Sequence, residues 1–234
     1  MMFEYKKLND LAGWTAFLIS LIVYSITVED TASFWDAGEF IAVSSKLEVP
    51  HPPGAPFYLL LGRFFSMFAF GVPENIAIAI NFLSVVSSAF TILFLFWTIT
   101  YLASKIIDPR LNNNNKVLVI LAGFIGSLSF TFTDSFWFSA VESEVYAMSS
   151  FFTAFVFWAI LKWESLDDEK DQNKWIILIA YMMGLSIGVH LLNLVTIPAL
   201  ALIIYFKKFK EVTFRGIVIS CLLYTSPSPR DIGE

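Results

Sequence analysis

Residues 75–102 read NIAIAINFLSVVSSAFTILFLFWTITYL, and no charged side chain interrupts the run. An α-helix needs about 20 apolar residues to cross a hydrocarbon core of about 30 Å, so this stretch predicts a membrane span that tilts or protrudes. The composition agrees, because 57% of the 234 residues are hydrophobic and 15% are charged, whereas about a quarter are charged in soluble domains. We therefore predict an all-α polytopic membrane protein.

Apolar runs elsewhere in the chain predict further spans at Leu11–Val28, Val117–Thr133, Ala147–Leu161 and Trp175–Phe206. The last of these is too long for one span, and we expect two short helices that turn near Gly188–Asn193. The scheme contains about six complete spans, all within a transmembrane domain at residues 1–224.

The C-terminal end of the chain differs in kind. Arg215–Tyr224 begins a seventh span that is truncated, because residues 225–234 read TSPSPRDIGE and end the apolar run before it can cross a bilayer. A loop at this depth would leave backbone groups unsatisfied in lipid. We expect residues 225–234 to be a non-native or truncated tail.

The apolar segment Ala55–Val72 is ambiguous, because it contains Arg63 and is bracketed by prolines. Counting it as a span would put the basic loops at residues 105–116 and 207–215 outside, against the positive-inside rule. We therefore lay it along the outer membrane surface, with the N-terminus inside. This choice, made from lysines and arginines alone, gathers on the outer side both histidines and the membrane-proximal acids: Asp36, Glu39, His51, Asp134, Glu142, Glu144 and His190.

Net charge and cysteine count exclude several functions. A net charge of -5 argues against nucleic acid as a partner. A single cysteine excludes an internal disulfide and a thiolate metal cluster. The chain has no Gly-rich nucleotide loop, no HExxH and no nucleophile elbow. No metal site is predicted, although a divalent metal stays open.

Asp36 and Glu39 follow the first span, within FWDAGEF at residues 34–40. Acids at i and i+3 lie on one helix face, and placing them beside a bilayer costs free energy. Ser33 and Asp36 also fit a capping box with Ser33 as N-cap, which would give Asp36 a structural role. The cap leaves Glu39 unexplained, so we favour both acids as catalytic residues, with Asp36 as a general base.

His51-Pro52-Pro53-Gly54 forms a rigid element, because each proline fixes φ and pushes the preceding residue toward an extended conformation. The element serves as a turn that aims the following helix. A histidine held by such a turn also suits binding of an anionic or hydroxyl group, so His51 is a substrate-binding candidate. Both roles stay open.

Glu142 and Glu144 lie at the start of the fourth span. Acids in a first helical turn complement the helix dipole, which would explain one of them. Two acids beside Tyr146 make a second acidic cluster on the outer side. We favour Glu144 and Tyr146 as substrate-binding residues.

His190 and Arg63 complete the substrate-binding candidates. His190 ends the apolar stretch GLSIGVH at residues 184–190 and is either a hydrogen-bonded structural group or a ligand. Arg63 could snorkel, pair with Glu74, or bind a lipid phosphate.

Three motifs resemble those of the GT-C membrane glycosyltransferases, especially the protein O-mannosyltransferases and a related bacterial membrane family of unknown function. They are Asp36-Ala37-Gly38-Glu39, His51-Pro52-Pro53-Gly54 and Glu144-Val145-Tyr146. The resemblance runs from about Leu11 to Phe206. It implies a GT-C-like bundle whose outer-face loop carries interfacial helices.

The resemblance also implies a function: transfer of a sugar, with mannose as one candidate, from a polyprenyl-phosphate donor to a hydroxyl of a protein or glycan acceptor. Membrane lipids would surround the protein, and the site would face the periplasm from a bacterial inner membrane. The first-loop aspartate, here Asp36, would be the base. The better-known mannosyltransferases have adjacent Asp-Glu, whereas two residues intervene here, so the role of Glu39 stays open.

A secondary transporter, using the outer carboxylates as an ion or proton relay, is the main alternative. Transporters place such groups near the bilayer midplane and often contain internal repeats. Here the acids lie at helix ends and no repeat is evident, so we favour the enzyme. An interaction subunit without activity is a third interpretation.

Overall fold

The computed structural model describes residues 2–109, 112–209 and 211–222. Within these residues every regular element is a helix, which confirms the predicted all-α class. The tail expected at residues 225–234 lies outside the described residues.

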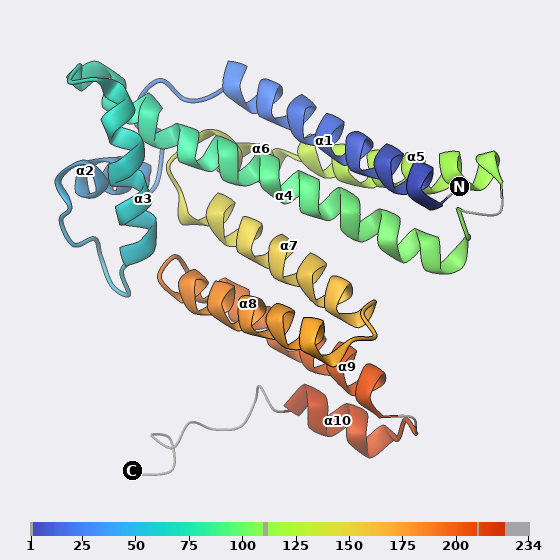
Figure 1. Ribbon diagram of the computed structural model, residues 1–234. Helices are drawn as coiled ribbons and strands as arrows, with labels where there is room; N and C mark the ends of the chain where they lie inside the picture. The colour runs from blue at the N-terminus through green and yellow to red at the C-terminus, as the bar shows by residue number, and fades with distance from the viewer. Residues whose placement is uncertain (1, 110–111, 210, 223–234) are drawn as a thin grey trace, which may run out of the picture.

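The long helices run side by side as a bundle (Figure 1). They are α1 (Met2–Ile26), α4 (Ile76–Ile106), α5 (Asn113–Thr131), α7 (Val145–Glu164), α8 (Glu169–Ile187) and α9 (Ile197–Lys208). α4 is the central helix, since it packs against α1, α5 and α7. Its apolar side chains, such as Ile80, Ile92 and Phe96, are fully buried. The long uncharged run is therefore both a span and the core.

Five of the described helices are long and apolar enough to cross a membrane: Glu4–Ile26, Pro73–Ile106, Asn113–Thr131, Val145–Glu164 and Leu191–Lys208. The sixth expected span corresponds to α8, which falls outside this group because its first two turns carry four charged side chains. The chain turns after α8 and continues through a 3-10 helix, η3 (Leu191–Thr196), into α9, so the predicted turn is confirmed. The apolar α10 (Phe214–Leu222) follows.

The segment between the first two long helices is folded at one end of the bundle. It contains α2 (Ala37–Lys46), α3 (Pro56–Ser66), η1 (Met67–Ala69) and η2 (Pro73–Asn75). In Figure 1, α3 runs across the direction of the long helices instead of alongside them. Its 11 residues are too few to cross a bilayer. This geometry agrees with the prediction that residues 55–72 lie along a membrane surface.

Different loops lie at the two ends of the bundle. The end with α2 and α3, here the acidic end, also receives the loops at residues 27–36, 132–144 and 188–190 (Figure 1). The start of α1 and the ends of α4, α7 and α9 lie at the opposite, basic end. A short helix that the sequence analysis missed, α6 (Asp134–Val141), lies between α5 and α7.

Asn81 of α4 holds two acidic-end loops in place. Its buried side-chain amide donates hydrogen bonds to the carbonyl oxygens of Glu29, at 2.7 Å, and Thr31, at 3.2 Å. Its amide oxygen accepts a short hydrogen bond from the Ser143 hydroxyl. Glu29 N–H in turn donates to the Val141 carbonyl at 3.0 Å. The loop before α2 and the linker before α7 are therefore fastened to the same point on the core helix.

The turn after α8 is fastened to α3. The carbonyl oxygen of Gly188 accepts hydrogen bonds from the backbone N–H groups of Phe57, at 2.7 Å, and Tyr58, at 3.3 Å. A Cβ atom at Gly188 would lie 2.8 Å from the Cβ of Phe57, so this close approach requires glycine. The start of α3, the linker before α7 and the turn after α8 thus meet at the acidic end.

Candidate functional site

The predicted capping box is wrong. α2 begins at Ala37, and its N-cap is Asp36, whose side chain makes no capping hydrogen bond. Ser33 instead donates a short hydrogen bond to the carboxylate of Glu142. Between Ser33 and the helix, Trp35 adopts a left-handed conformation (φ 58°) that turns the chain and delays the helix start to Ala37. Helix capping therefore does not explain the carboxylate of Asp36, whose side chain is 55% exposed.

Glu39 and His51 join the first two sequence motifs. One carboxylate oxygen of Glu39 lies 2.8 Å from His51 Nδ1, and the other accepts the His51 backbone N–H at 2.7 Å. This hydrogen bond raises the pKa of His51 and lowers the pKa of Glu39. The pair therefore favours a protonated imidazole beside an ionised carboxylate.

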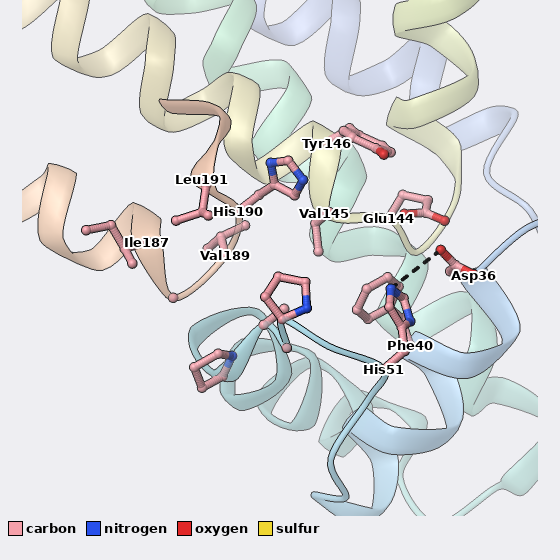
Figure 2. A pocket seen from close by; sticks show the side chains of 15 residues that line it. Asp36, Phe40, His51, Glu144, Val145, Tyr146, Ile187, Val189, His190 and Leu191 are labelled. Carbon is pink, nitrogen blue, oxygen red and sulfur yellow. Dashed lines mark ion pairs between the residues drawn. The ribbon is translucent and has the colours of Figure 1, made fainter. Parts of the chain in front are cut away.

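The second ring nitrogen of His51 faces Asp36. His51 Nε2 lies 4.0 Å from Asp36 Oδ2, the pair marked by the dashed line in Figure 2. Glu39 thus fixes the ring from one side and leaves the other nitrogen directed at the carboxylate expected to act as base.

A cavity of about 340 Å³ opens beside this pair, and we call it the site pocket. Figure 2 shows that its walls come from the start of α2, the His51–Gly54 turn, the start of α7 and the turn after α8. Five of the seven predicted site residues line it: Asp36, His51, Glu144, Tyr146 and His190. Glu39 does not line the pocket, but it is hydrogen-bonded to His51 and so belongs to the same group of side chains.

Glu144 is the most deeply buried acid of the site pocket, with 5% of its surface exposed. It lies in the linker between α6 and α7, as N-cap of α7, rather than within the first helical turn. Burial raises its pKa to about 7, and the nearby charges of Asp36 and Glu142 act in the same direction. Near neutral pH this carboxyl group can therefore both accept and release a proton.

His190 has the structural role and also lines the site pocket. It is the N-cap of η3, and its Nδ1 accepts the Leu192 N–H at 3.0 Å. In the neutral ring the proton is therefore on Nε2, which makes this nitrogen a hydrogen-bond donor. The Tyr146 ring packs against the imidazole, with centroids 5.6 Å apart.

Arg63 lies outside the site pocket. It is on α3, is exposed, and donates a hydrogen bond to the carbonyl oxygen of Ser45 near the end of α2. The position of Arg63 therefore does not support a contact between its side chain and a ligand in this pocket.

Three of the site residues could also hold a metal ion. Asp36, Glu39 and His51 offer ligand atoms that all lie within 4.8 Å of one another. In the observed arrangement Glu39 already bonds His51 Nδ1, which leaves Asp36 and His51 Nε2 to face a cation. Metal-binding histidines are often oriented by an outer carboxylate in this way. The residues therefore fit either a divalent cation or a protonated histidine.

Two buried residues that were not predicted to belong to the site hold its loops in place. Asn81 and Ser143 are buried and fix the loops that carry Asp36 and Glu144. An asparagine inside an otherwise apolar span was the available signal, because a polar side chain there needs an internal partner. Nothing in the local pattern indicated that Ser33 would bond Glu142.

The family model and the similar proteins all indicate the same family. A family model described as the protein O-mannosyl-transferase TMEM260 N-terminal domain matches residues 36–213. The chain is similar to protein O-mannosyl-transferase tmem260 of Dictyostelium discoideum, with 31% identity over 156 residues, or 65% of this chain and 17% of that protein. It is also similar to protein O-mannosyl-transferase TMEM260 of Mus musculus, with 26% identity over 203 residues, or 86% of this chain and 26% of that protein. No solved structure matches the chain.

Proposed function

Because this chain belongs to the family of the protein O-mannosyl-transferase TMEM260 N-terminal domain, we propose that it carries the membrane-embedded active site of a glycosyltransferase. Both curated relatives are named protein O-mannosyl-transferases, which supports mannose as the sugar and a protein hydroxyl as the acceptor. The chain spans only 17% and 26% of their lengths. The activity is therefore proposed for the full-length protein that contains this domain.

One observation carries the proposal. Residues from three separate motifs, Asp36, His51 and Glu144, meet at one cavity at the end of a membrane bundle. A secondary transporter would be expected to place such groups near the middle of the helices. The location at a helix end instead suits a substrate whose head group lies at the membrane surface.

The proposed donor is a sugar linked to polyprenyl phosphate, with its lipid tail in the bilayer. The acceptor hydroxyl oxygen forms a bond to the anomeric carbon of the sugar. The bond from that carbon to the phosphate oxygen breaks, and the phosphate leaves with the electron pair. The acceptor proton passes to the carboxylate of Asp36, which acts as general base.

The leaving phosphate needs positive charge or hydrogen-bond donors, because negative charge develops on its oxygen in the transition state. His51 suits this task, since Glu39 raises its pKa and so favours the cationic ring. The Nε2 atom of His190 is a second donor in the same pocket. Glu144 is an alternative base, because its pKa of about 7 allows it to exchange protons at neutral pH.

We place the acidic end on the outer side of the membrane, which is the periplasmic side in a bacterium. The support is the positive-inside rule, because the opposite end carries the basic loops. Those basic residues are Lys6, Lys7, Lys105, Lys116, Lys162, Lys170, Lys174, Lys207, Lys208 and Arg215.

The direct test is sugar transfer by the full-length protein in membranes. Mannosyl polyprenyl phosphate with a labelled sugar would be supplied together with serine- and threonine-containing peptides. We expect label on the peptide, with and without a chelator, because Glu39 can keep His51 positively charged without a metal. Loss of transfer that Mn²⁺ restores would assign a cation to Asp36 and His51. Ion-driven solute uptake without transfer would contradict the proposal.

A further inference from the structure

A second hollow borders the same carboxylates, Asp36 and Glu144. It measures about 350 Å³, and we call it the side hollow. Its lining residues are Trp35, Asp36, Phe138, Ser139, Glu142, Glu144 and Tyr146. Asp36, Glu144 and Tyr146 also line the site pocket. These three residues therefore form a wall that the two cavities share.

A transferase must bring two substrates to one reacting centre. A base in the shared wall can take the proton from an acceptor hydroxyl in one cavity while the sugar donor lies in the other. The wall contains Asp36, the base candidate, and Glu144, whose burial makes it the alternative. Both hollows therefore give access to Asp36 and Glu144, as two substrates that react at one carboxylate would need.

The charges of the two cavities differ. The titratable side chains that line the site pocket include His51 and His190, which can donate to a phosphate. The ionisable groups around the side hollow, among the residues described, are carboxyl groups and the phenol of Tyr146, with no basic side chain. Asp36 and Glu144 line both cavities, so the acid that distinguishes the side hollow is Glu142, which is buried and therefore poorly screened by solvent. A phosphate anion is therefore disfavoured in the side hollow, whereas an uncharged hydroxyl can donate a hydrogen bond to its carboxylates.

Trp35 stands at the rim of this hollow in an unusual conformation. Its backbone lies in the left-handed region, which is costly for a bulky residue, and its side chain is 86% exposed. Phe138 of α6, also exposed, lines the same hollow. Two exposed aromatic rings offer apolar surface beside the buried carboxylates, and aromatic side chains of this kind are common where proteins bind a peptide.

We propose that the side hollow is the acceptor site and takes the hydroxyl side chain of a polypeptide segment. This inference rests on the proposed function and deepens it. The hydroxyl reaches the shared wall, where its oxygen attacks the anomeric carbon and its proton passes to Asp36. The sugar-linked phosphate occupies the site pocket. Trp35 and Phe138 hold the residues on either side of the hydroxyl.

The first test compares Trp35→Ala with Phe34→Ala. Phe34 is the adjacent residue, is 79% exposed, and does not line the hollow. With mannosyl polyprenyl phosphate and a threonine-containing peptide, Trp35→Ala should raise the KM for the peptide about tenfold. The KM for the donor should stay within about twofold. Phe34→Ala should leave both constants unchanged, and Trp35→Phe should recover most of the peptide affinity.

The second test blocks the hollow by chemical modification. In a background with Cys221→Ser, a cysteine would replace Ser139, which lines the hollow, or Ser135, one turn earlier on α6. A bulky thiol reagent on Ser139→Cys should abolish transfer to peptide while slow hydrolysis of the donor by water continues. The same reagent on Ser135→Cys should leave peptide transfer intact.

Two results would overturn the inference. A rise in donor KM in Trp35→Ala, with unchanged peptide KM, would assign the hollow to the donor. Equal effects of Trp35→Ala and Phe34→Ala would make Trp35 a membrane contact instead. Either result leaves the proposed transferase standing, whereas the absence of both transfer and donor hydrolysis in the unmodified protein would reject the proposed function as well.

Discussion

Glu39 binds His51 through both of its carboxylate oxygens, one to the ring Nδ1 at 2.8 Å and one to the backbone N–H at 2.7 Å. Twelve residues separate the two in the chain, so the contact closes the α2 segment against the His51–Gly54 turn. The contact also sets the protonation of His51. Because Glu39 raises the pKa of His51, the ring keeps its proton to a higher pH than the usual 6.5.

Replacing Glu39 by glutamine should therefore change the pH dependence of donor binding. Glutamine can still accept a hydrogen bond but carries no charge, so the pKa of His51 should fall toward its usual value. In the unmodified protein, the donor KM should rise as the pH passes upward through the raised pKa of His51. In Glu39→Gln this rise should occur at lower pH. The two proteins should agree at about pH 5.5, where both rings are protonated, and differ several-fold near pH 7.5.

The control for this measurement is Glu48→Gln, which removes an exposed acid just after α2. It lies at the same end of the molecule, but the carboxylate that bonds His51 is that of Glu39. Its pH profile should match that of the unmodified protein. If Glu39→Gln also matches that profile, His51 does not bind the donor as a cation.

Glu144→Gln should change how stability depends on pH. The pKa of Glu144 is raised from 4.5 to about 7, so the folded protein holds a proton that the unfolded chain has released between these values. Stability therefore falls as the pH rises through this window, and glutamine removes that loss. We expect Glu144→Gln to raise Tm by about 2–4 °C at about pH 8 and to leave it unchanged near pH 5. An equal change at both pH values would show that packing, rather than titration, is responsible.

Membrane orientation is tested by labelling single cysteines in intact cells. Glu48 and Ser135 are exposed at the acidic end, whereas Asn113 begins α5 at the basic end. With Cys221 replaced, an impermeant thiol reagent should modify Glu48→Cys and Ser135→Cys from outside. Asn113→Cys should react only after the membrane is opened. Labelling of Asn113→Cys from outside would invert the assignment and place the site on the inner side.

The helices were predictable because each follows from a local pattern. An apolar run of about 20 residues predicts a membrane-spanning helix, and the count of basic residues predicts on which side each loop lies. The count of basic residues also predicted that Ala55–Val72 does not span the membrane, and its helices are too short to do so. α6 was missed because eight residues are too few to give a clear periodic signal.

The sequence indicated most of the residues that lie together at the candidate site, but not the contacts between them. Polar residues at span ends identified Asp36, His51 and Glu144, since such groups need a reason to lie beside a bilayer. The capping box failed because it assumed a helix start at Ser33, whereas the left-handed turn at Trp35 delays the start. Ser33, which precedes that turn, donates its hydrogen bond to Glu142 in the linker before α7, more than 100 residues away. A contact between residues so far apart in the chain cannot be predicted from the local sequence.

Asp36→Asn separates the catalytic role of Asp36 from a structural one. The Asp36 side chain makes no capping bond, so asparagine at this N-cap position should cost little stability and leave Tm nearly unchanged. Asparagine cannot accept the acceptor proton, so transfer should fall by about two orders of magnitude or more. Donor KM should change little, because a carboxylate does not help to hold a phosphate. The matched variant Asp134→Asn alters an exposed acid at the start of α6 and should keep normal transfer. If Asp36→Asn keeps near-normal transfer, or loses it only together with its folded structure, Asp36 is not the base. Glu144, the buried acid on the same wall, then becomes the residue to test.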